Sequence, residues 1–550
     1  LTSGDIVRLD EGARAAFGLA EDLGVDAVDL LDGVSLPASS TLFVDSMLAR
    51  TPALEADRDA AFRRTVERLD TLGKMDFTVP ASLKATLRGY QVDGYQWLGS
   101  LEHLGLGGIL ADDMGLGKTL QMIAHILARV EAGDTKPTLV VCPASLVYNW
   151  TAELERFAPS LDVCAIVGAK AQRRVQIAGV AEHNVVVTSY DLMRRDIDEY
   201  AEQDFGRVVL DEAQYIKNPL TQVARAAKRL PAGVRFALTG TPIENRLSEL
   251  WSIFDFLMPG LLGTRESFAK RFESPVEHAE GDSAARLQAL VSPFVLRRVK
   301  EDVVADLPEK IEDTVMAQLT GEQRKLYLAN QDRIAQQVQH REASEFKKDK
   351  LKVLAELTKL RQICCDPHLH YEDYKAGSAK LDACMELVHG ALDGGHHILL
   401  FSQFTGMLDI IGKRLAKEDI GFLKLTGASS KESRAKMVAQ FQAGEVPVFL
   451  ISLKAGGVGL NLTAADVVIH YDPWWNVAAQ DQATDRAHRI GQQHTVTVYK
   501  LIAKDTIEER IMQMQESKRD LVNSVLGGDG ISSALFTRED VLALLGGDGR

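Results

Sequence analysis

The sequence predicts an α/β fold with two lobes, each built on a parallel sheet. From Leu83 onward, short apolar runs alternate with amphipathic helical stretches, as where GGILAD precedes KTLQMIAHILARV. Such alternation of strand and helix is typical of parallel sheets. The alternation fades between about Glu244 and Gly377, where charged helical periodicity dominates, and it resumes at HILLFSQF. We therefore expect a helical insertion between the two lobes.

The order of these patterns divides the chain of 550 residues into five segments. The first segment is acidic and is interpreted as a small N-terminal accessory segment, and the last is a short tail. The predicted boundaries are 1–80 for the accessory segment, 81–245 for the first lobe, 246–377 for the helical insertion and inter-lobe linker, 378–526 for the second lobe and 527–550 for the tail.

The composition is that of soluble globular domains, with 46% hydrophobic and 25% charged residues. No run approaches the roughly 18 uninterrupted apolar residues of a membrane span, so no membrane contact is expected. The first residues, LTSGDIVRLD, have neither the basic nor the apolar region of a secretory signal, and the absence of an initiator Met suggests an excised fragment. These features predict a cytoplasmic protein.

The cysteines are predicted to be buried free thiols. They form no CxxC pair and have no His at zinc-ligand spacing, so neither a disulfide nor a metal cluster is expected. The five cysteines are Cys142, Cys164, Cys364, Cys365 and Cys384.

Acidic charge is concentrated at the N-terminus. The net charge is −14, and residues 1–80 carry 8 Lys and Arg against 15 Asp and Glu, a balance of −7. Phosphate contacts act locally, within a Debye length of about 8 Å at physiological salt. The net charge therefore does not exclude nucleic acid as a partner.

A phosphate-binding loop is predicted at DDMGLGKT, which follows a strand-like GGILA and opens a long helix. Gly115 and Gly117 allow backbone N–H groups to close on phosphate oxygens. Lys118 can reach the β- and γ-phosphates, and the Thr119 hydroxyl can bind Mg²⁺. A glycine-rich turn that only caps a core helix is the alternative. The residues predicted to bind nucleotide are Asp112, Asp113, Met114, Gly115, Leu116, Gly117, Lys118 and Thr119.

Two carboxylates follow the apolar run VVL, in the segment DEAQ. This places Asp211 and Glu212 at the carboxyl edge of a parallel sheet, where ligands of open α/β folds bind. Asp211 is suited to hold Mg²⁺, partly through water, and Glu212 to orient and deprotonate an attacking water.

Taken together, these motifs resemble those of the SWI/SNF-type ATPases, a branch of the superfamily-two helicases. LRGYQ, DDMGLGKT, DEAQ, LTGTPIEN, SLKAGGVGLNL and DRAHRIGQ stand in the family's order between about Leu83 and Leu526. The resemblance implies two RecA-like lobes, ATP and magnesium as cofactors, and double-stranded DNA as partner. Departures from the family pattern are Gly89 in place of Pro, Gln214 in place of His, and Leu453 and Lys454 in place of Thr and Arg.

The resemblance also implies roles for single residues. Gln91 would contact adenine, and Thr239 and Thr241 would couple the nucleotide site to DNA. Arg486 and Arg489 are three residues apart, so on a helix both would project from one face. The resemblance assigns this pair to an arginine-finger motif that stabilises charge on the transferred phosphoryl group. Two solvated surface arginines are the alternative.

A nucleic-acid path across both lobes is the third implication. Small hydroxyl and amide side chains suit phosphate contacts that carry no sequence information. The basic run between Lys347 and Lys352 either extends this path or is a solvated helix face. The residues expected on the path are Pro143, Ser145, Thr188, Ser189, Gln403 and Lys454.

Three further features have open interpretations. Arg297 and Arg298 are either a brace near the lobe junction or a nucleic-acid contact. Residues 506–526 read as one long amphipathic helix. Trp474 and Trp475 could stack on bases, but packing against protein is favoured because the bases of a duplex are not available for stacking.

The leading functional hypothesis is an ATP hydrolase stimulated by nucleic acid that moves along or remodels double-stranded DNA. Such an enzyme would associate with the nucleoid in the cytoplasm and act on nucleoprotein complexes. A strand-separating DNA or RNA helicase is the alternative, and a catalytically inactive scaffold is a third possibility. The presence of Lys118, Asp211 and Glu212 argues against the scaffold.

Overall fold

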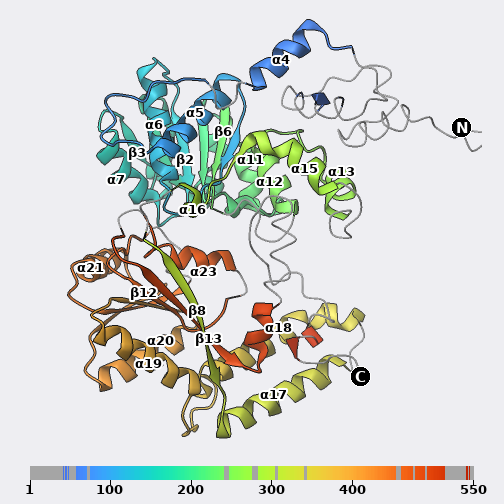
Figure 1. Ribbon diagram of the computed structural model, residues 1–550. Helices are drawn as coiled ribbons and strands as arrows, with labels where there is room; N and C mark the ends of the chain where they lie inside the picture. Colours follow the sequence, from blue (N-terminus) through green and yellow to red (C-terminus); the bar gives the residue numbers. More distant parts are fainter. Residues whose placement is uncertain are drawn as a thin grey trace, which may run out of the picture. The chain divides into compact units, whose positions relative to one another are not determined.

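The chain forms two compact units, one ending at Val303 and one following it. The computed structural model describes residues 57–70, 75–240, 247–274, 283–303, 308–339, 343–453, 460–474, 477–489 and 492–513, with single positions near each end. Each unit contains one sheet in which every described strand pair is parallel (Figure 1). The predicted fold class is confirmed.

The described sheet of the first unit has seven strands in the order β3-β4-β2-β5-β6-β1-β7. Its inner strands are almost wholly buried, because runs such as TLVVC and VVVTS carry apolar side chains to both faces. The strands are β1 (Gly108–Leu110), β2 (Thr138–Cys142), β3 (Val163–Ala165), β4 (Val185–Ser189), β5 (Arg207–Asp211), β6 (Val234–Leu238) and β7 (Val295–Leu296).

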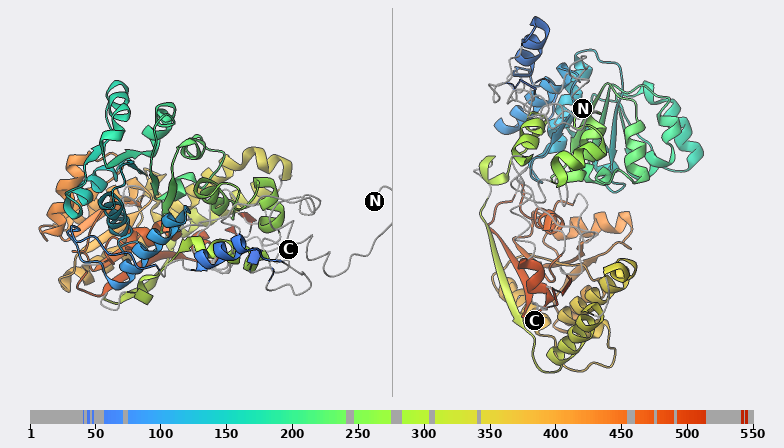
Figure 2. Two further views of the ribbon diagram at one scale, coloured as in Figure 1. Left: turned by 90° about the horizontal axis from the view of Figure 1, so that it is seen from above. Right: turned by 90° about the vertical axis from the view of Figure 1, so that its right-hand side faces the viewer.

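Helices flank this sheet on both sides in the right-hand view of Figure 2. The helices from α6 to α15 connect successive parallel strands, as α/β crossovers require. The described helices of the unit are α4 (Ala60–Asp70), α5 (Gly89–His103), α6 (Lys118–Glu131), α7 (Val147–Phe157), α8 (Lys170–Ala178), α9 (Tyr190–Arg195), α10 (Ile197–Tyr200), α11 (Gln222–Arg229), α12 (Leu247–Leu257), α13 (Arg265–Phe268), α15 (Ser283–Val291) and α16 (Lys300–Val303).

The described sheet of the second unit has six strands in the order β10-β11-β9-β12-β13-β8. Alternate residues of β9 enter different cores: Leu400 packs in one cluster with α19 and α20, and Phe401 packs in another with the end of α23. The strands are β8 (Lys310–Gln318), β9 (Ile398–Ser402), β10 (Phe422–Leu425), β11 (Val448–Ser452), β12 (Val467–His470) and β13 (Val496–Lys504). The described helices are α17 (Gly321–Gln339), α18 (Ala343–Cys365), α19 (Ala379–Asp393), α20 (Thr405–Lys417), α21 (Lys431–Gln442) and α23 (Val477–Thr484).

The predicted boundary between the helical insertion and the second lobe needs correction. The segment 246–377 contains β8, which pairs with β13 over nine residues and belongs to the second sheet. The second unit therefore starts soon after Val303, well before residue 378. Most side chains of β8 are exposed and several are charged, as expected for an edge strand. The strand has no continuous apolar run to reveal it.

The other sequence expectations on architecture are partly met. All five cysteines are free thiols, and all but the partly exposed Cys164 are buried. Residues 507–513 are helical, and the rest of the predicted helix up to residue 526 lies outside the described residues. Among the helices that the structure describes, none has the length and apolar character needed to cross a membrane.

Candidate active site

Three loops of the first unit meet at the carboxyl edge of its sheet. They follow β1, β5 and β6, and β6 lies between the other two strands. In register, Leu110 and Asp211 both align with Leu238. This arrangement brings together the glycine-rich loop, the two carboxylates and Thr239, although more than a hundred residues separate the first from the last.

The glycine-rich loop has the backbone that its sequence predicts. Gly115 and Gly117 have φ angles of 86° and 77°, a left-handed conformation that favours glycine, and α6 begins at the next residue, Lys118. The Lys118 ammonium lies inside the loop, where Nζ donates to the main-chain oxygens of Asp112 at 2.5 Å and Asp113 at 3.2 Å. A cation enclosed by this loop is suited to receive phosphate oxygens in place of those carbonyls.

The start of α5 packs against the same loop. Gln91 Nε2 donates to the Leu116 carbonyl at 3.0 Å, and its Oε1 accepts from the Arg88 amide at 2.9 Å. A Cβ atom on Gly117 would stand 2.5 Å from Gln91 Nε2, so a larger residue would displace this glutamine. Gln91 therefore packs against the phosphate loop, and its contact with adenine stays a prediction.

The side chain of Asp112 has a structural partner. It is fully buried, its Oδ1 accepts from Arg298 Nε at 2.8 Å, and its Oδ2 accepts from Gln121 Nε2 at 3.1 Å. We therefore revise the interpretation of Asp112 as a nucleotide ligand, because only its main chain remains for that role. The same ion pair makes Arg298 a brace of the phosphate loop, while the roles considered from the sequence, at the lobe junction or on nucleic acid, stay predictions.

Asp211 and Glu212 end β5 in a constrained geometry. Asp211 Oδ2 accepts from Trp150 Nε1 at 2.8 Å, and Oδ1 accepts from the Glu212 amide at 2.9 Å. Glu212 has a left-handed φ of 53°, which is uncommon for a residue with a Cβ atom. Burial, together with the neighbouring Glu212 carboxylate, raises the pKa of Asp211 to about 7. A cation at this edge would stabilise the ionised form of Asp211.

A hydrogen-bonded chain extends from Glu212. Gln214 Nε2 donates to Glu212 Oε2 at 2.8 Å, and Thr239 Oγ1 donates to Gln214 Oε1 at 2.9 Å. Gln214, which replaces the more common His of the family pattern, thus joins the loop after β5 to the loop after β6. Thr241 lies outside the described residues, so its role stays a prediction.

The donor set suits a magnesium–nucleotide complex. Mg²⁺ prefers oxygen ligands and commonly uses one or two protein groups, with nucleotide phosphates and water completing its shell. Asp211 supplies a carboxylate, and Thr119 supplies a hydroxyl in the first turn of α6. No group of three or more His, Cys, Asp or Glu residues in the described part of the chain could hold a metal ion by itself.

The predicted nucleic-acid residues of the first unit follow β2 or end β4, but only one of them is exposed. Ser145 is exposed, whereas Pro143 is buried. Thr188 is fully buried and donates to the Ile166 carbonyl at 3.3 Å, and Ser189 Oγ accepts from the Leu192 amide to cap α9. Burial leaves Pro143, Thr188 and Ser189 without the surface that a side-chain contact with phosphate requires. That contact stays a prediction for Ser145.

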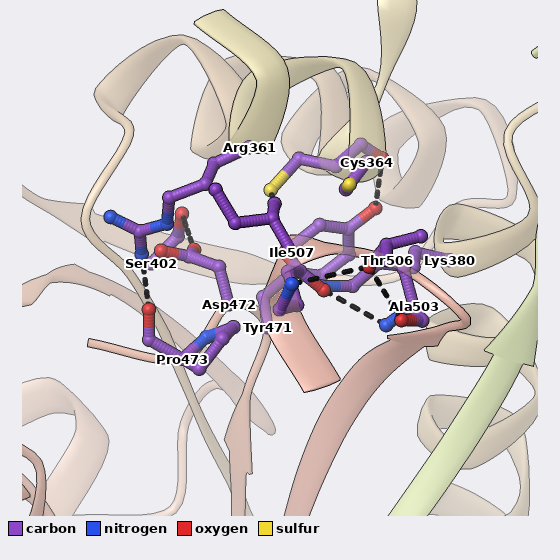
Figure 3. Close-up of polar contacts among 12 residues, drawn as sticks. Arg361, Cys364, Lys380, Ser402, Tyr471, Asp472, Pro473, Ala503, Thr506 and Ile507 are labelled. Carbon is purple, nitrogen blue, oxygen red and sulfur yellow. Dashed lines mark hydrogen bonds and ion pairs between the residues drawn. The ribbon is translucent and has the colours of Figure 1, made fainter. Parts of the chain in front are cut away.

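In the second unit, Gln403 follows β9 and is partly exposed. Its Oε1 accepts from Arg361 NH1 at 3.2 Å. Arg361 is almost fully buried and also donates to the Pro473 carbonyl, next to the Ser402–Asp472 hydrogen bond (Figure 3). Lys454 lies outside the described residues, and contact of either residue with nucleic acid stays a prediction.

The expected helical pair of arginines is not helical. α23 ends at Thr484, and the amides of Arg486 and Ala487 bond to carbonyls three residues back, as Ala487 N does to Thr484 O. Arg486 therefore lies in a turn and is buried, while Arg489 is partly exposed. Both residues belong to the second unit, and their approach to nucleotide stays a prediction.

Gln492 fixes this turn and was not singled out from the sequence. Its Nε2 donates to the carbonyls of Ala487 at 3.1 Å and Ala465 at 2.7 Å. The Arg486 carbonyl in turn accepts from the Leu462 amide at 3.0 Å. The only signal was its place in DRAHRIGQ, because its partners are main-chain atoms that no motif reveals.

The structure describes only part of the tryptophan pair and of the basic run singled out in the sequence. Trp474 packs against the apolar cluster that contains Phe401, as the packing interpretation predicts. Trp475 lies outside the described residues, as do the side chains of Lys347, Lys348 and Lys350.

The first unit is that of a P-loop nucleotide-binding protein, because a glycine-rich loop encloses a lysine and a pair of carboxylates lies two strands away. A second α/β lobe follows it in the chain. Residues 90–369 match the family model of the SNF2-related domain, and residues 379–491 match that of the helicase conserved C-terminal domain. The chain belongs to the SNF2 family.

Similar proteins come from bacteria and eukaryotes. An uncharacterized ATP-dependent helicase of Mycoplasma pneumoniae is 40% identical over 84% of this chain and 44% of its own length. The putative ATP-dependent helicase/translocase YwqA of Bacillus subtilis is 39% identical over 94% of this chain and 58% of its own length. The TATA-binding protein-associated factor mot1 of Schizosaccharomyces pombe is 35% identical over 88% of this chain and 28% of its own length. The chain thus spans about half the length of the bacterial relatives.

Solved structures that resemble the chain include the Sulfolobus solfataricus SWI2/SNF2 ATPase core in complex with dsDNA. It is 38% identical, with a TM-score of 0.44, over 82% of this chain and 95% of that one.

Proposed function

We propose that the chain hydrolyses ATP and uses the reaction to move along double-stranded DNA. The observation that carries the proposal is the position of Lys118, Asp211 and Glu212 at one edge of the first sheet. Lys118 follows the loop after β1, the two carboxylates lie at the end of β5, and β6 pairs with both strands. Two bacterial relatives have names that include ATP-dependent helicase, which agrees with an ATP-driven action on nucleic acid. The preference for duplex over single strands rests on the resemblance of the motifs.

The residues divide the chemistry among them. Lys118 binds the β- and γ-phosphates, and the loop amides around Gly115 and Gly117 orient them. Asp211 and Thr119 hold magnesium, which neutralises charge on the phosphate oxygens when bound. Glu212, fixed by Gln214, orients the attacking water and accepts its proton. Arg486 and Arg489 stabilise the charge that develops on the transferred phosphoryl group.

This function places the protein in the cytoplasm, at the nucleoid, with nucleoprotein complexes as possible substrates. A strand-separating helicase remains the second candidate, because its ATP site would be the same. The two candidates differ in the nucleic acid that stimulates hydrolysis and in the product released.

The first prediction separates translocase from strand-separating helicase. We expect duplex DNA to stimulate ATP hydrolysis more than single strands or RNA, and rising salt to weaken that stimulation because phosphate contacts release counterions. The protein should also displace a triplex-forming third strand with ATP, and Lys118→Ala should abolish the displacement. Efficient fork unwinding without third-strand displacement would favour the helicase.

The second prediction concerns the arginines. Arg489→Ala is expected to lower kcat at least about 10²-fold and to leave ATP affinity within a few-fold, because a finger acts mainly in the transition state. Arg414→Ala is the control, since Arg414 is a similarly exposed arginine of the second unit that pairs with Glu418. Loss of ATP affinity with an unchanged kcat would remove Arg489 from this role.

A further inference from the structure

We propose that Trp150 is a positioning residue that links contact of a DNA phosphate backbone with the start of α7 to the geometry of Asp211. The inference rests on the proposed function and adds a route by which duplex DNA stimulates hydrolysis within the first unit.

The central contact is a single hydrogen bond. Trp150 is 1% exposed, and its indole Nε1 donates to Asp211 Oδ2 at 2.8 Å. An indole N–H has no acceptor capacity, so this bond fixes one carboxylate oxygen without adding charge. The other oxygen accepts from the Glu212 amide. Trp150 therefore determines how the Asp211 carboxylate faces the phosphate loop.

The choice of partner distinguishes Trp150 from two other buried tryptophans of the first unit. A buried indole needs an acceptor, and a main-chain carbonyl is sufficient. Trp97 donates to the Pro293 carbonyl at 3.3 Å, and Trp251 donates to the Gly263 carbonyl at 3.1 Å. Trp150 instead donates to the carboxylate that we assign to magnesium. Packing alone would not require that acceptor.

The main chain of Trp150 is tied to the exposed start of its helix. Trp150 N donates to the Leu146 carbonyl at 2.9 Å, and Leu146 N donates to the Pro143 carbonyl at 2.8 Å. Ser145 is exposed between them, and Tyr148 is 45% exposed one residue into α7. A phosphate that contacts Ser145 therefore acts on a segment one helical turn from the indole.

A second segment of the predicted nucleic-acid path also reaches Asp211. Tyr190 follows Ser189 at the end of β4, and its hydroxyl donates to the Asp211 carbonyl at 2.9 Å. Tyr190 is buried beneath Tyr215, whose ring stacks on it with centroids 4.8 Å apart. Asp211 is thus held through its carboxylate by Trp150 of α7 and through its main chain by Tyr190, the residue that follows β4.

The test replaces only the donor. Trp150→Phe keeps an aromatic ring in the core and removes the N–H group, and Trp251→Phe is the matched control because its indole bonds only to a main-chain carbonyl. We measure the stimulation factor, which is the ATPase rate with saturating duplex DNA divided by the rate without it. Trp150→Phe is expected to lower this factor at least about fivefold and to leave duplex affinity, measured without nucleotide, within about twofold. Trp251→Phe should leave both quantities unchanged.

A spectroscopic measurement avoids dependence on activity. Protein labelled with 5-fluorotryptophan gives a separate ¹⁹F resonance for each tryptophan, and Trp150→Phe or, if that variant is unstable, Trp150→Tyr assigns the one of interest. Adding duplex DNA without nucleotide should shift the Trp150 resonance and leave that of Trp251 in place.

The outcomes separate the two proposals. The proposed link between DNA contact and Asp211 would be overturned if Trp150→Phe left the stimulation factor unchanged, or if duplex DNA did not shift the Trp150 resonance. The proposed function would still stand. If duplex DNA did not change the ATPase rate of the wild-type protein, both the proposed function and the proposed link would be overturned.

Discussion

Glu212→Gln is expected to reduce ATP turnover by about 10²–10⁴-fold, the range typical of a lost general base. The substitution keeps the side-chain length, and its amide oxygen can still accept the hydrogen bond that Gln214 gives to Glu212. It also places no new demand on the left-handed backbone at this position. ATP affinity should therefore stay within a few-fold of wild type, because the phosphates are held by the loop and Lys118.

Two further variants make this result specific. Lys118→Ala should weaken nucleotide binding itself, since it removes the cation enclosed by the phosphate loop. Glu202→Gln removes an exposed carboxylate of the same unit and should change neither quantity. Nucleotide binding is measured with a fluorescent ATP analogue, and turnover by phosphate release. Wild-type turnover in Glu212→Gln would show that another group activates the water.

The fold could be predicted where strands are apolar on both faces. Runs such as TLVVC and VFLIS can be satisfied only inside a covered parallel sheet, so their pattern is visible in the sequence. β8 could not be found in this way, because an edge strand has few apolar side chains to bury and is defined by its hydrogen bonds to β13. β8 and β13 lie 186 residues apart in the sequence, so their pairing, which assigns β8 to the second unit, could not be predicted from local pattern.

The site could be predicted where function depends on local backbone. The two left-handed glycines lie two residues apart in the phosphate loop, and the two carboxylates are neighbours at the end of β5, so their types and spacing identify each motif. The residues that hold them are not consecutive. Trp150 is 61 residues from Asp211, and Arg298 is 186 residues from Asp112. Only the packing of the folded unit reveals such pairs.

The arginine motif shows where local spacing misleads. The three-residue spacing of Arg486 and Arg489 predicted a helix, but α23 ends at Thr484, before both residues. Bonds to the third residue back tighten the chain there, as is common at helix ends. Gln492 Nε2 then donates to the Ala487 carbonyl, which an amide of a continued helix would otherwise have satisfied. Periodicity alone cannot show such an ending, because it reports side chains and not main-chain partners.

A buried ion pair stabilises the second unit. Lys380 Nζ lies 2.7 Å and 3.0 Å from the two carboxylate oxygens of Glu508, and both side chains are fully buried (Figure 3 shows Lys380 in this network). Glu508 Oε2 also accepts from the Ala503 amide at 2.9 Å, and the Lys380 ammonium lies over the Tyr471 ring. The pair thus joins α19 to the helical residues that follow β13.

Lys380 is expected to be ionised at neutral pH. Burial alone would lower the pKa of Lys380, but the Glu508 carboxylate raises it by more, so the pKa lies above its ordinary value. A raised lysine pKa means that the stabilisation is fully present below the pKa of the unfolded chain and is lost only as the pH rises through the folded value. A rise in pH within the physiological range should therefore leave the Lys380 ammonium charged.

Lys380→Met is expected to lower the unfolding free energy of the second unit by about 3–5 kcal/mol, the typical cost of leaving one member of a buried pair uncompensated. The loss is measured by urea denaturation and localised by hydrogen exchange of the β12 and β13 amides, because the two units need not unfold together.

Lys375→Met, which replaces an exposed lysine of the same unit, is the control and should cost less than about 0.5 kcal/mol. Adding Glu508→Gln to Lys380→Met should recover most of the loss, since neither position of the pair then carries a charge, while an acceptor for the Ala503 amide is kept. A loss of less than about 1 kcal/mol in Lys380→Met, or no recovery in the double variant, would show that the uncompensated charge is not what destabilises the unit.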